Sequence, residues 1–212
     1  YDRMRNGLMP TTMASNPEFV MDSFTKQVTS GFDVLHISFS SALSGSCSNA
    51  TVAAREVCEE NEGARIVVVD SCCASMGQGL LVYKAIQLKE AGKSLDEVVA
   101  WIEENKNHLC HQFTVDNLFH LHRGGRVSKA TAIIGTLINV KPVLHVDNEG
   151  HLIPLTNVRG RKKALTSLVD NMEQKIKGYD NDVVFISHGD CIDDANFVAD
   201  LIKSRFGITN IM

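Results

Sequence analysis

The sequence predicts a mixed α/β protein in which a doubly wound parallel sheet is followed by a second, smaller α+β domain. Two apolar strand patterns, 33–39 and 65–70, are each followed by a small-residue loop and a helical pattern. Such strand–helix–strand units form right-handed crossovers and a parallel sheet covered on both faces. Two later strand patterns flank Asn148-Glu-Gly150, which indicates an antiparallel hairpin. The change of pattern predicts domains at 1–122 and 123–212, the second incomplete at its C-terminal end.

Length and composition agree with this class. The 212 residues, 44% hydrophobic and 22% charged, are typical of a soluble globular protein with one large or two small domains. A net charge of −4 offers no general attraction to nucleic acid. No apolar run approaches the ~20 residues of a membrane span, and the first residues lack a signal-peptide pattern. We therefore expect a cytoplasmic protein with no integral membrane segment.

The elements of the first domain follow from caps and periodicity. Ser15-Asn-Pro-Glu18 is expected to cap a helix that carries Phe19, Phe24 and Val28 on one face and runs to about Gly31. A second capping box begins at Ser94, and Gly92 is expected to end the helix before it. The remaining expected elements are strand 33–39, loop 40–46, helix 47–60, strand 65–70, loop 71–79 and helix 80–91.

The second domain is expected to begin with the Gly124-Gly125 turn. Its predicted elements are strands 139–147 and 151–158, an amphipathic helix in 159–178, strand 183–187, helix 190–207 and the start of a strand in 208–212. A strand without a following partner loop is an unusual natural terminus, so we expect that the chain is trimmed.

The most informative segment is the serine-rich loop between the first strand and its helix. Ser40, Ser41, Ser44 and Ser46 place four hydroxyls beside the expected helix start at Cys47. Hydroxyls, free backbone N–H groups and the positive end of the helix dipole suit a small anion, such as a carboxylate or phosphate. Each serine taken singly is equally well explained as an ordinary helix cap.

Other reactive patterns are weaker. The six cysteines form no CxxC pair, which argues against structural zinc and a disulfide framework, so no metal is expected. The serine loop lacks the Gly-Xaa-Ser-Xaa-Gly elbow of serine hydrolases, and nucleotide-binding glycine motifs are absent. The Ser187–Asp190 cluster is interpreted as a loop and cap for the following helix, and Asp70-Ser71 likewise as a cap.

Four segments, in order along the chain, resemble one family. The serine motif at 40–46 (SSALSGS) looks like that of DegV-type fatty-acid-binding proteins. The other similar segments are TTMAS at 11–15, HRGGRVS at 122–128, and VKPVL at 140–144 with VRGRKKA at 158–164. The resemblance spans nearly the whole chain. It departs from the family in lacking the Gln-Pro pair of the first motif and in carrying Ser46 where threonine is usual.

The resemblance implies a bacterial, non-enzymatic DegV-like carrier. It would hold a long-chain fatty acid in an interdomain tunnel, with the carboxylate bound by Thr11, Ser41, Ser44, the helix start at Gly45, and Arg126. Arg159 would face a partner, a fatty acid kinase catalytic subunit that makes acyl phosphate for phospholipid synthesis. The fatty acid is the only expected ligand, without a cofactor. Relative to the family, segments before Tyr1 and after Met212 are missing.

Alternatives remain open at this point. The same loop would suit a serine-dependent esterase or thioesterase, or a small-molecule phosphate-binding, kinase-like subunit. Neither Ser41 nor Ser44 is favoured as the main head-group contact. Arg126 is also explained by a solvated interdomain salt bridge. The run Arg159, Arg161, Lys162 and Lys163 is also explained as a solvated face, with Arg159 at a helix start, where a cation opposes the dipole.

Overall fold

The computed structural model describes residues 1–128 and 139–212 and confirms a mixed α/β protein with separate parallel and antiparallel sheets. The chain forms two compact units. Unit 1 contains 1–12, 110–147 and 152–212, and unit 2 contains 13–109 and 148–151. The short strand β3, Gln112–Thr114, pairs within unit 1, so these units differ from the division expected at residue 122. As a statement about domains, that division stays a prediction.

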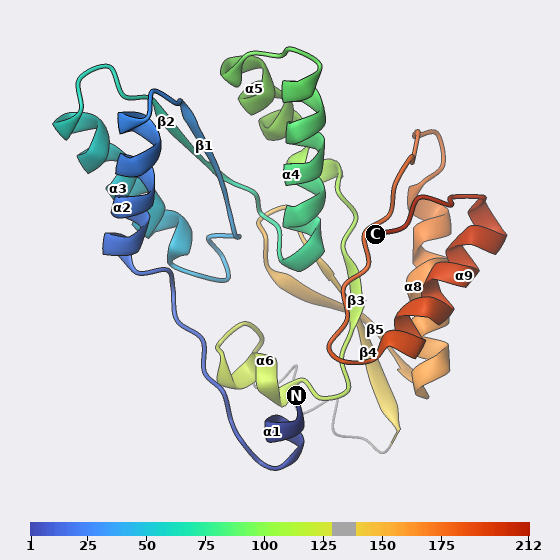
Figure 1. Ribbon diagram of the computed structural model, residues 1–212. Helices are drawn as coiled ribbons and strands as arrows, with labels where there is room; N and C mark the ends of the chain where they lie inside the picture. The colour runs from blue at the N-terminus through green and yellow to red at the C-terminus, as the bar shows by residue number, and fades with distance from the viewer. Residues whose placement is uncertain (129–138) are drawn as a thin grey trace. The chain divides into compact units, whose positions relative to one another are not determined.

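Unit 2 is built around two parallel strands, β1 (Val34–Ser38) and β2 (Ile66–Asp70), paired in register from Val34 opposite Ile66 to Ser38 opposite Asp70. Helices α2 (Pro17–Thr29) and α3 (Ser46–Glu60) lie side by side on one face, as Figure 1 shows. Helices α4 (Ser75–Glu90) and α5 (Leu95–Asn105) cover the other face, and the short 3₁₀ helix η1 (Lys106–His108) follows α5. The expected doubly wound arrangement is confirmed.

Each face of this sheet has its own core. Small side chains of α3, Ala50, Ala53 and Ala54, pack with Phe24 and Val57, which lets α3 approach the strands closely. On the other face Leu81 and Ile102, both fully buried, join Val69, Cys73, Ala85 and Val98. The continuous apolar runs of β1 and β2 are explained by this burial on both faces.

Two helix starts differ from the expectation. Helix α4 begins at Ser75, inside the stretch 71–79 that the sequence predicts as a loop. The N-cap of α2 is Asn16, whose side chain accepts a hydrogen bond from the Glu18 N–H, so the expected capping box at Ser15 is wrong. Because Ser15 precedes the cap, its backbone groups bond elsewhere, to Ser46 and Asn49. Phe19 does not share the buried face of Phe24, because its side chain is 74% exposed. The capping box at Ser94 and the positive φ of Gly92 are confirmed.

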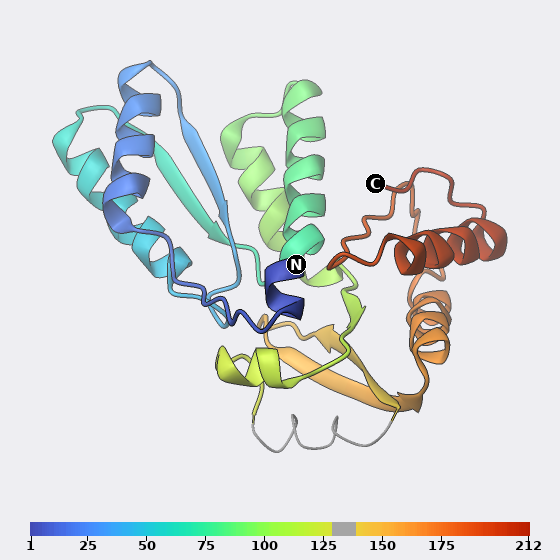
Figure 2. The same cartoon turned by 60° about the horizontal axis from the view of Figure 1, so that its bottom comes forward.

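Unit 1 contains the antiparallel sheet β3–β4–β5, with β4 at Val140–Val146 and β5 at Leu152–Arg159. Helix α8 (Arg161–Lys175) packs on this sheet and α9 (Ile192–Phe206) packs on α8, as Figures 1 and 2 show. The predicted hairpin is confirmed, with a β-bulge near Leu144. Two short helices, α1 (Asp2–Arg5) and α6 (Phe119–Arg123), belong to the same unit.

The two strands expected at 183–187 and 208–212 meet only at one parallel bridge, between Val184 and Ile211. Backbone hydrogen bonds of Val184 and Ile186 to the segment ending at Met212 hold them together. Their side chains pack against α8 and α9, whose core contains Leu165, Val169 and Ile202. Among the helices that the structure describes, none is both long and apolar enough to cross a membrane.

Candidate functional site

Two loops of unit 2 leave the carboxyl ends of β1 and β2 and lie side by side. The Ser40 N–H donates to the Cys73 carbonyl at 2.9 Å, and the Ser71 N–H donates to the Ser38 carbonyl at 3.2 Å. Parallel strands end at the same edge of a sheet, which is why loops separated by about thirty residues meet here. We call residues 39–45 the serine loop and 71–74 the cysteine loop.

Three of the four serine hydroxyls are already bonded within the fold. Ser40 is fully buried and donates to the Gly150 carbonyl at 3.0 Å. The hydroxyls of Ser44 and Ser46 lie 2.9 Å apart, and the Ser44 oxygen also accepts from the Ser46 N–H. Ser46 further accepts from the Ser15 N–H. These serines therefore shape the loop and its junction with the segment before α2.

Ser41 differs from its neighbours. It is exposed, and within the described residues its hydroxyl has no hydrogen-bond partner. Beside it, Gly45 is the N-cap of α3 and offers no side-chain acceptor. Past Ser46, whose N–H is satisfied by Ser44, the first-turn N–H groups of Cys47 and Ser48 have no acceptor among the described side chains. A free hydroxyl and open helix N–H groups are donors suited to an anion.

Asp70 performs a different role from the one expected. Its carboxylate accepts from the Ser41 N–H at 3.2 Å and from the Cys72 N–H at 3.0 Å. Helix α4 instead has Ala74 as its N-cap, without a side-chain hydrogen bond, so the interpretation of Asp70 as a helix cap is wrong. The carboxylate reaches across to the neighbouring strand's loop because β1 and β2 end in register.

Sequence reasoning missed Lys106. Its side chain is only 16% exposed, and its ammonium donates to the Asp70 carbonyl at 3.0 Å and pairs with Glu103 at 2.7 Å. Burial lowers the pKa of Lys106, but the hydrogen bond and charge of Glu103, together with the charge of Asp70, outweigh burial and hold it above its ordinary value. Lys106 is thus a fixed positive charge behind the two loops. Its place in a polar stretch after α5 carries no signal of this contact.

The thiols of the cysteine loop have raised pKa values. Burial, followed by the charge of Asp70, raises the pKa of Cys72, and burial raises that of Cys73 to about 12. Cys72 also adopts a positive φ of 52°, which its hydrogen bond to Asp70 supports. Thiolates are the reactive form of cysteine, so these side chains act as packing and not as nucleophiles.

The tip of the β4–β5 hairpin, residues 148–151, also belongs to unit 2. Gly150 has φ of 85°, and a Cβ added there would overlap the Ser40 hydroxyl and approach the Cys72 Cα to 3.1 Å. Only glycine fits at this point. The hairpin glycine expected from the sequence is therefore also the residue that packs against Ser40 and accepts its hydrogen bond.

The other predicted site residues belong to unit 1. Thr11 is exposed in the segment after α1. Arg126 follows Gly125, whose φ of 77° confirms the expected turn, and its N–H donates to Leu121 at 2.9 Å. The Arg126 guanidinium also bonds the Gly124 carbonyl, which closes the turn at the end of α6. Their participation in a carboxylate site stays a prediction.

Arg159 is the last residue of β5, opposite Val140, so its expected place at a helix start is wrong. Gly160, with φ of 89°, separates it from α8. The side chain is exposed and has no partner within the described ranges. Because Arg159 lies in a strand and not in the first turn of a helix, its positive charge does not oppose the dipole of α8.

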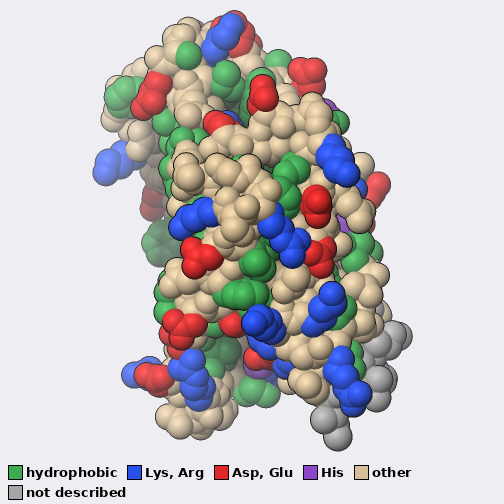
Figure 3. Space-filling model, turned by 90° about the vertical axis from the view of Figure 1, so that its right-hand side faces the viewer, with side chains coloured by type: hydrophobic (Ala, Val, Ile, Leu, Met, Phe, Trp, Pro, Cys, Tyr) green, Lys and Arg blue, Asp and Glu red, His purple; other side chains and the backbone are tan. Residues whose placement is uncertain are grey.

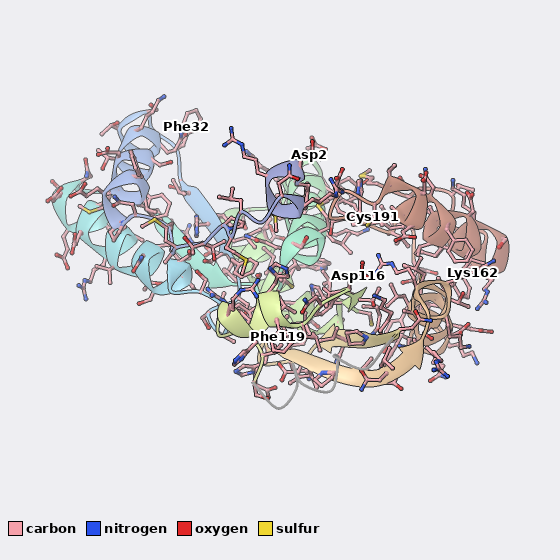
Figure 4. All side chains as sticks on the ribbon, turned by 90° about the horizontal axis from the view of Figure 1, so that it is seen from below. Asp2, Phe32, Asp116, Phe119, Lys162 and Cys191 are labelled. Carbon is pink, nitrogen blue, oxygen red and sulfur yellow. The ribbon has the colours of Figure 1, made fainter. Side chains whose placement is uncertain are left out.

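The following basic residues are only partly free. Arg161 pairs with Asp194 at 2.8 Å and lies 3.7 Å from Asp116, and Lys162 lies over the Phe197 ring. In Figure 4 Asp116 lies on the chain that leaves β3. Figure 3 shows Lys and Arg side chains on this side of the protein with Asp and Glu between them. The cation of Arg161 at the first position of α8 is explained by its carboxylate partners.

A shallow hollow of about 330 Å³ lies at the opposite ends of β1 and β2. Phe32, Asp33, Glu62 and Arg65 are among the residues that line it, and Phe32, labelled in Figure 4, is 62% exposed. It is open and partly charged, which does not suit an acyl chain. Its place at the amino ends of the strands separates it from the serine loop.

The sequence matches the family model described as "Uncharacterised protein, DegV family" over residues 1–212. A DegV domain-containing protein of Clostridium perfringens is 42% identical over 212 residues, which are 100% of this chain and 73% of that protein. A DegV domain-containing protein of Lactococcus lactis is 35% identical over 98% of this chain and 72% of its own.

Solved structures of DegV family proteins have a similar fold. A Thermus thermophilus protein, described as "Fatty Acid Binding of a DegV family Protein", has a TM-score of 0.83 and 30% identity. The match covers 100% of this chain and 74% of the Thermus thermophilus chain. A Bacillus subtilis protein, described as "DegV, a fatty acid binding protein", has a TM-score of 0.83 and 26% identity. The match covers 100% of this chain and 73% of the Bacillus subtilis chain.

Proposed function

Because this chain belongs to the DegV family, we propose that it is a carrier that binds a long-chain fatty acid without transforming it. Support comes from the solved relatives of Thermus thermophilus and Bacillus subtilis, which are described as fatty-acid-binding proteins. The chain spans about three quarters of the length of these relatives. The expected tunnel for the acyl chain stays a prediction.

The acyl tail and the carboxylate of such a ligand contribute differently to the binding free energy. Burying ~14 methylenes at ~0.8 kcal/mol each contributes about 11 kcal/mol before the entropic cost of binding. A buried carboxylate without partners costs several kcal/mol, and charge-assisted hydrogen bonds of about 1.5–3 kcal/mol each offset that cost. The tail therefore supplies affinity, and the head-group donors decide which chemical class is accepted.

The observation that carries the proposal is the Ser41 hydroxyl, which has no partner among the described residues, beside the open N–H groups of Cys47 and Ser48 in the first turn of α3. Ser44 already bonds Ser46, so turning it toward a ligand would break a contact of 2.9 Å. We therefore assign Ser41 as the principal carboxylate contact, with Ser44 and the helix start at Gly45 as secondary donors. Thr11 and Arg126 are proposed to complete the head-group site.

The proposal extends to a partner. We propose that Arg159, an exposed cation at the end of β5, faces a fatty acid kinase catalytic subunit. That enzyme would convert the presented acid to acyl phosphate for phospholipid synthesis in the bacterial cytoplasm. An unpaired guanidinium suits recognition of a carboxylate or phosphate because it offers a planar set of donors.

Native mass spectrometry of the freshly purified full chain tests the function. We expect an added mass equal to a long-chain fatty acid, released on denaturation. After delipidation, oleate affinity should fall about tenfold in Ser41→Ala, as expected for losing one charged hydrogen bond, and less in Ser44→Ala. Ser30→Ala is the matched control, because that exposed hydroxyl bonds only the Lys26 carbonyl at the end of α2.

Two outcomes would contradict the proposal. Hydrolysis of an acyl ester by the parent chain, lost in Ser41→Ala, would indicate a serine-dependent esterase or thioesterase. A bound phosphorylated small molecule in place of a fatty acid would indicate a phosphate-binding subunit.

A further inference from the structure

A carboxylate beside the serine loop does not suit an acidic ligand. The Asp70 carboxylate lies 3.2 Å from the backbone nitrogen of Ser41, the residue assigned above to the ligand carboxylate. Two negative groups near one another repel, and in a partly buried site the repulsion is larger than in water. Taken alone, Asp70 would therefore favour a neutral ligand over an ionised one.

Lys106 supplies a positive charge beside Asp70, which it shares with Glu103. Its ammonium lies 3.0 Å from the backbone carbonyl of Asp70 and 2.7 Å from Glu103, and its side chain is largely buried. A buried ammonium keeps its charge only where partners offset its desolvation, and the pKa of Lys106 is held above its ordinary value. The ammonium therefore lies at the carboxyl end of β2, against the backbone of Asp70.

The same contacts fix the geometry of the loop. Lys106 holds the last residue of β2, and the side chain of that residue, Asp70, then holds the N–H groups of Ser41 and Cys72. Each contact joins a different element: η1 to β2, and β2 to the loop after β1. A displacement of Lys106 would thus be transmitted to Ser41.

From these contacts we propose that Lys106 is a positioning and specificity-determining residue. Through Asp70 it sets the Ser41 backbone, and its charge, shared with Glu103, offsets part of the Asp70 charge, so that the site accepts an ionised acid. This deepens the proposed function and rests on it. Lys106 acts through Asp70 and does not itself touch the ligand. Asp70 fixes the loop, and Lys106 lowers the electrostatic cost of having a carboxylate there.

The test compares oleate with oleyl alcohol, which share a tail and differ in head-group charge. Lys106→Met should weaken oleate binding by about tenfold and oleyl alcohol binding by less than about threefold, because charge repulsion acts only on the acid. Lys106→Arg should retain the parent's preference for the acid. Lys93→Met is the matched control, since Lys93 lies just before α5, pairs with Glu97 of that helix and makes no contact with Asp70.

Asp70→Asn provides a second, opposite prediction. Asparagine keeps an oxygen acceptor for the Ser41 and Cys72 N–H groups and removes the negative charge. Oleate affinity should stay at the parent level or rise, and combining this change with Lys106→Met should restore most of the lost oleate affinity. Equal weakening of both ligands by Lys106→Met, or weaker oleate binding in Asp70→Asn, would overturn the proposal, since both point to a purely structural role.

Failure of the function itself has a different signature. If the delipidated parent binds neither oleate nor oleyl alcohol, the carrier function is wrong. The positioning role is then judged by amide hydrogen exchange of the ligand-free chain. Lys106→Met should speed exchange at Ser41 and Cys72, and Lys93→Met should not. Unchanged exchange at both amides would refute the role of Lys106 without any reference to lipid.

Discussion

The close packing of Gly150 against Ser40 predicts a large cost for one added methyl group. Gly150→Ala must hold φ of 85°, which costs a residue with a Cβ about 1–2 kcal/mol. The new Cβ also overlaps the Ser40 hydroxyl and approaches the Cys72 Cα to 3.1 Å, where backbone cannot easily move. Overpacking of this kind adds about 1–3 kcal/mol, so we expect a total loss of about 2–5 kcal/mol in the free energy of unfolding.

Gly63→Ala is the matched control. Its φ is 79°, and a Cβ there meets nothing within 4 Å, so only the backbone cost of about 1–2 kcal/mol applies. The difference between the two variants isolates the steric contact with the serine loop. Urea unfolding followed by fluorescence measures both losses, because the single tryptophan, Trp101, packs against the core of the same unit.

A double variant sharpens the test. Ser40→Ala removes the hydroxyl that the new Cβ would overlap, so the cost of Ser40→Ala with Gly150→Ala should be smaller than the sum of the single costs by about 1 kcal/mol or more. Equal losses in Gly150→Ala and Gly63→Ala, or strict additivity in the double variant, would refute the packing argument.

Three further predictions concern unit 2. Leu81 is fully buried, and Leu81→Ala should lower the free energy of unfolding by about 2–5 kcal/mol in the same urea experiment; a loss under about 1 kcal/mol would show that the site collapses. The hydrogen bond of Lys93, followed by those of the Ser94 cap, lowers the pKa of Glu97 to about 2 from 4.5. A carboxyl group whose pKa is lowered on folding stabilises the fold at pH values above its unfolded-state pKa. Glu97→Gln should therefore be less stable than the parent above pH 4.5, and the difference in the free energy of unfolding should close as the pH falls toward 2. A difference that persists at pH of about 2 would contradict this. Cys73, whose pKa burial raises to about 12, should resist iodoacetamide at pH of about 8 in the native chain and react in urea, as peptide mass spectrometry would show.

The elements themselves were largely predictable. The helix that starts at Ser94, the turn at Gly125 and the hairpin at Gly150 were each indicated by residues a few positions apart, because caps, turns and periodicity depend on local backbone geometry. Where two local signals competed, the outcome was less certain. Asn16 caps α2 in preference to Ser15, and one exposed aromatic, Phe19, was wrongly placed on the buried face.

The bonding state of the serines was not predictable. Ser41 and Ser44 look equivalent in the sequence, yet the Ser44 hydroxyl bonds Ser46, and the Ser41 hydroxyl has no partner among the described residues. The hydrogen bonds from Ser41 to Asp70 and from Lys106 to Asp70 join residues that are 29 and 36 positions apart. Their formation depends on the register of β1 and β2 and on where α5 ends, which no local pattern records.

The amino-acid sequence by itself determined the family, the mixed α/β class and the position of the serine loop, because periodicity, caps and short motifs act within a few residues. Only the tertiary structure decided that the Asp70 carboxylate holds the Ser41 N–H, that the Lys106 ammonium contacts the Asp70 carbonyl and that the Ser40 hydroxyl bonds the Gly150 carbonyl. Those contacts join separate elements and arise from the pairing of parallel strands and the packing of helices around them.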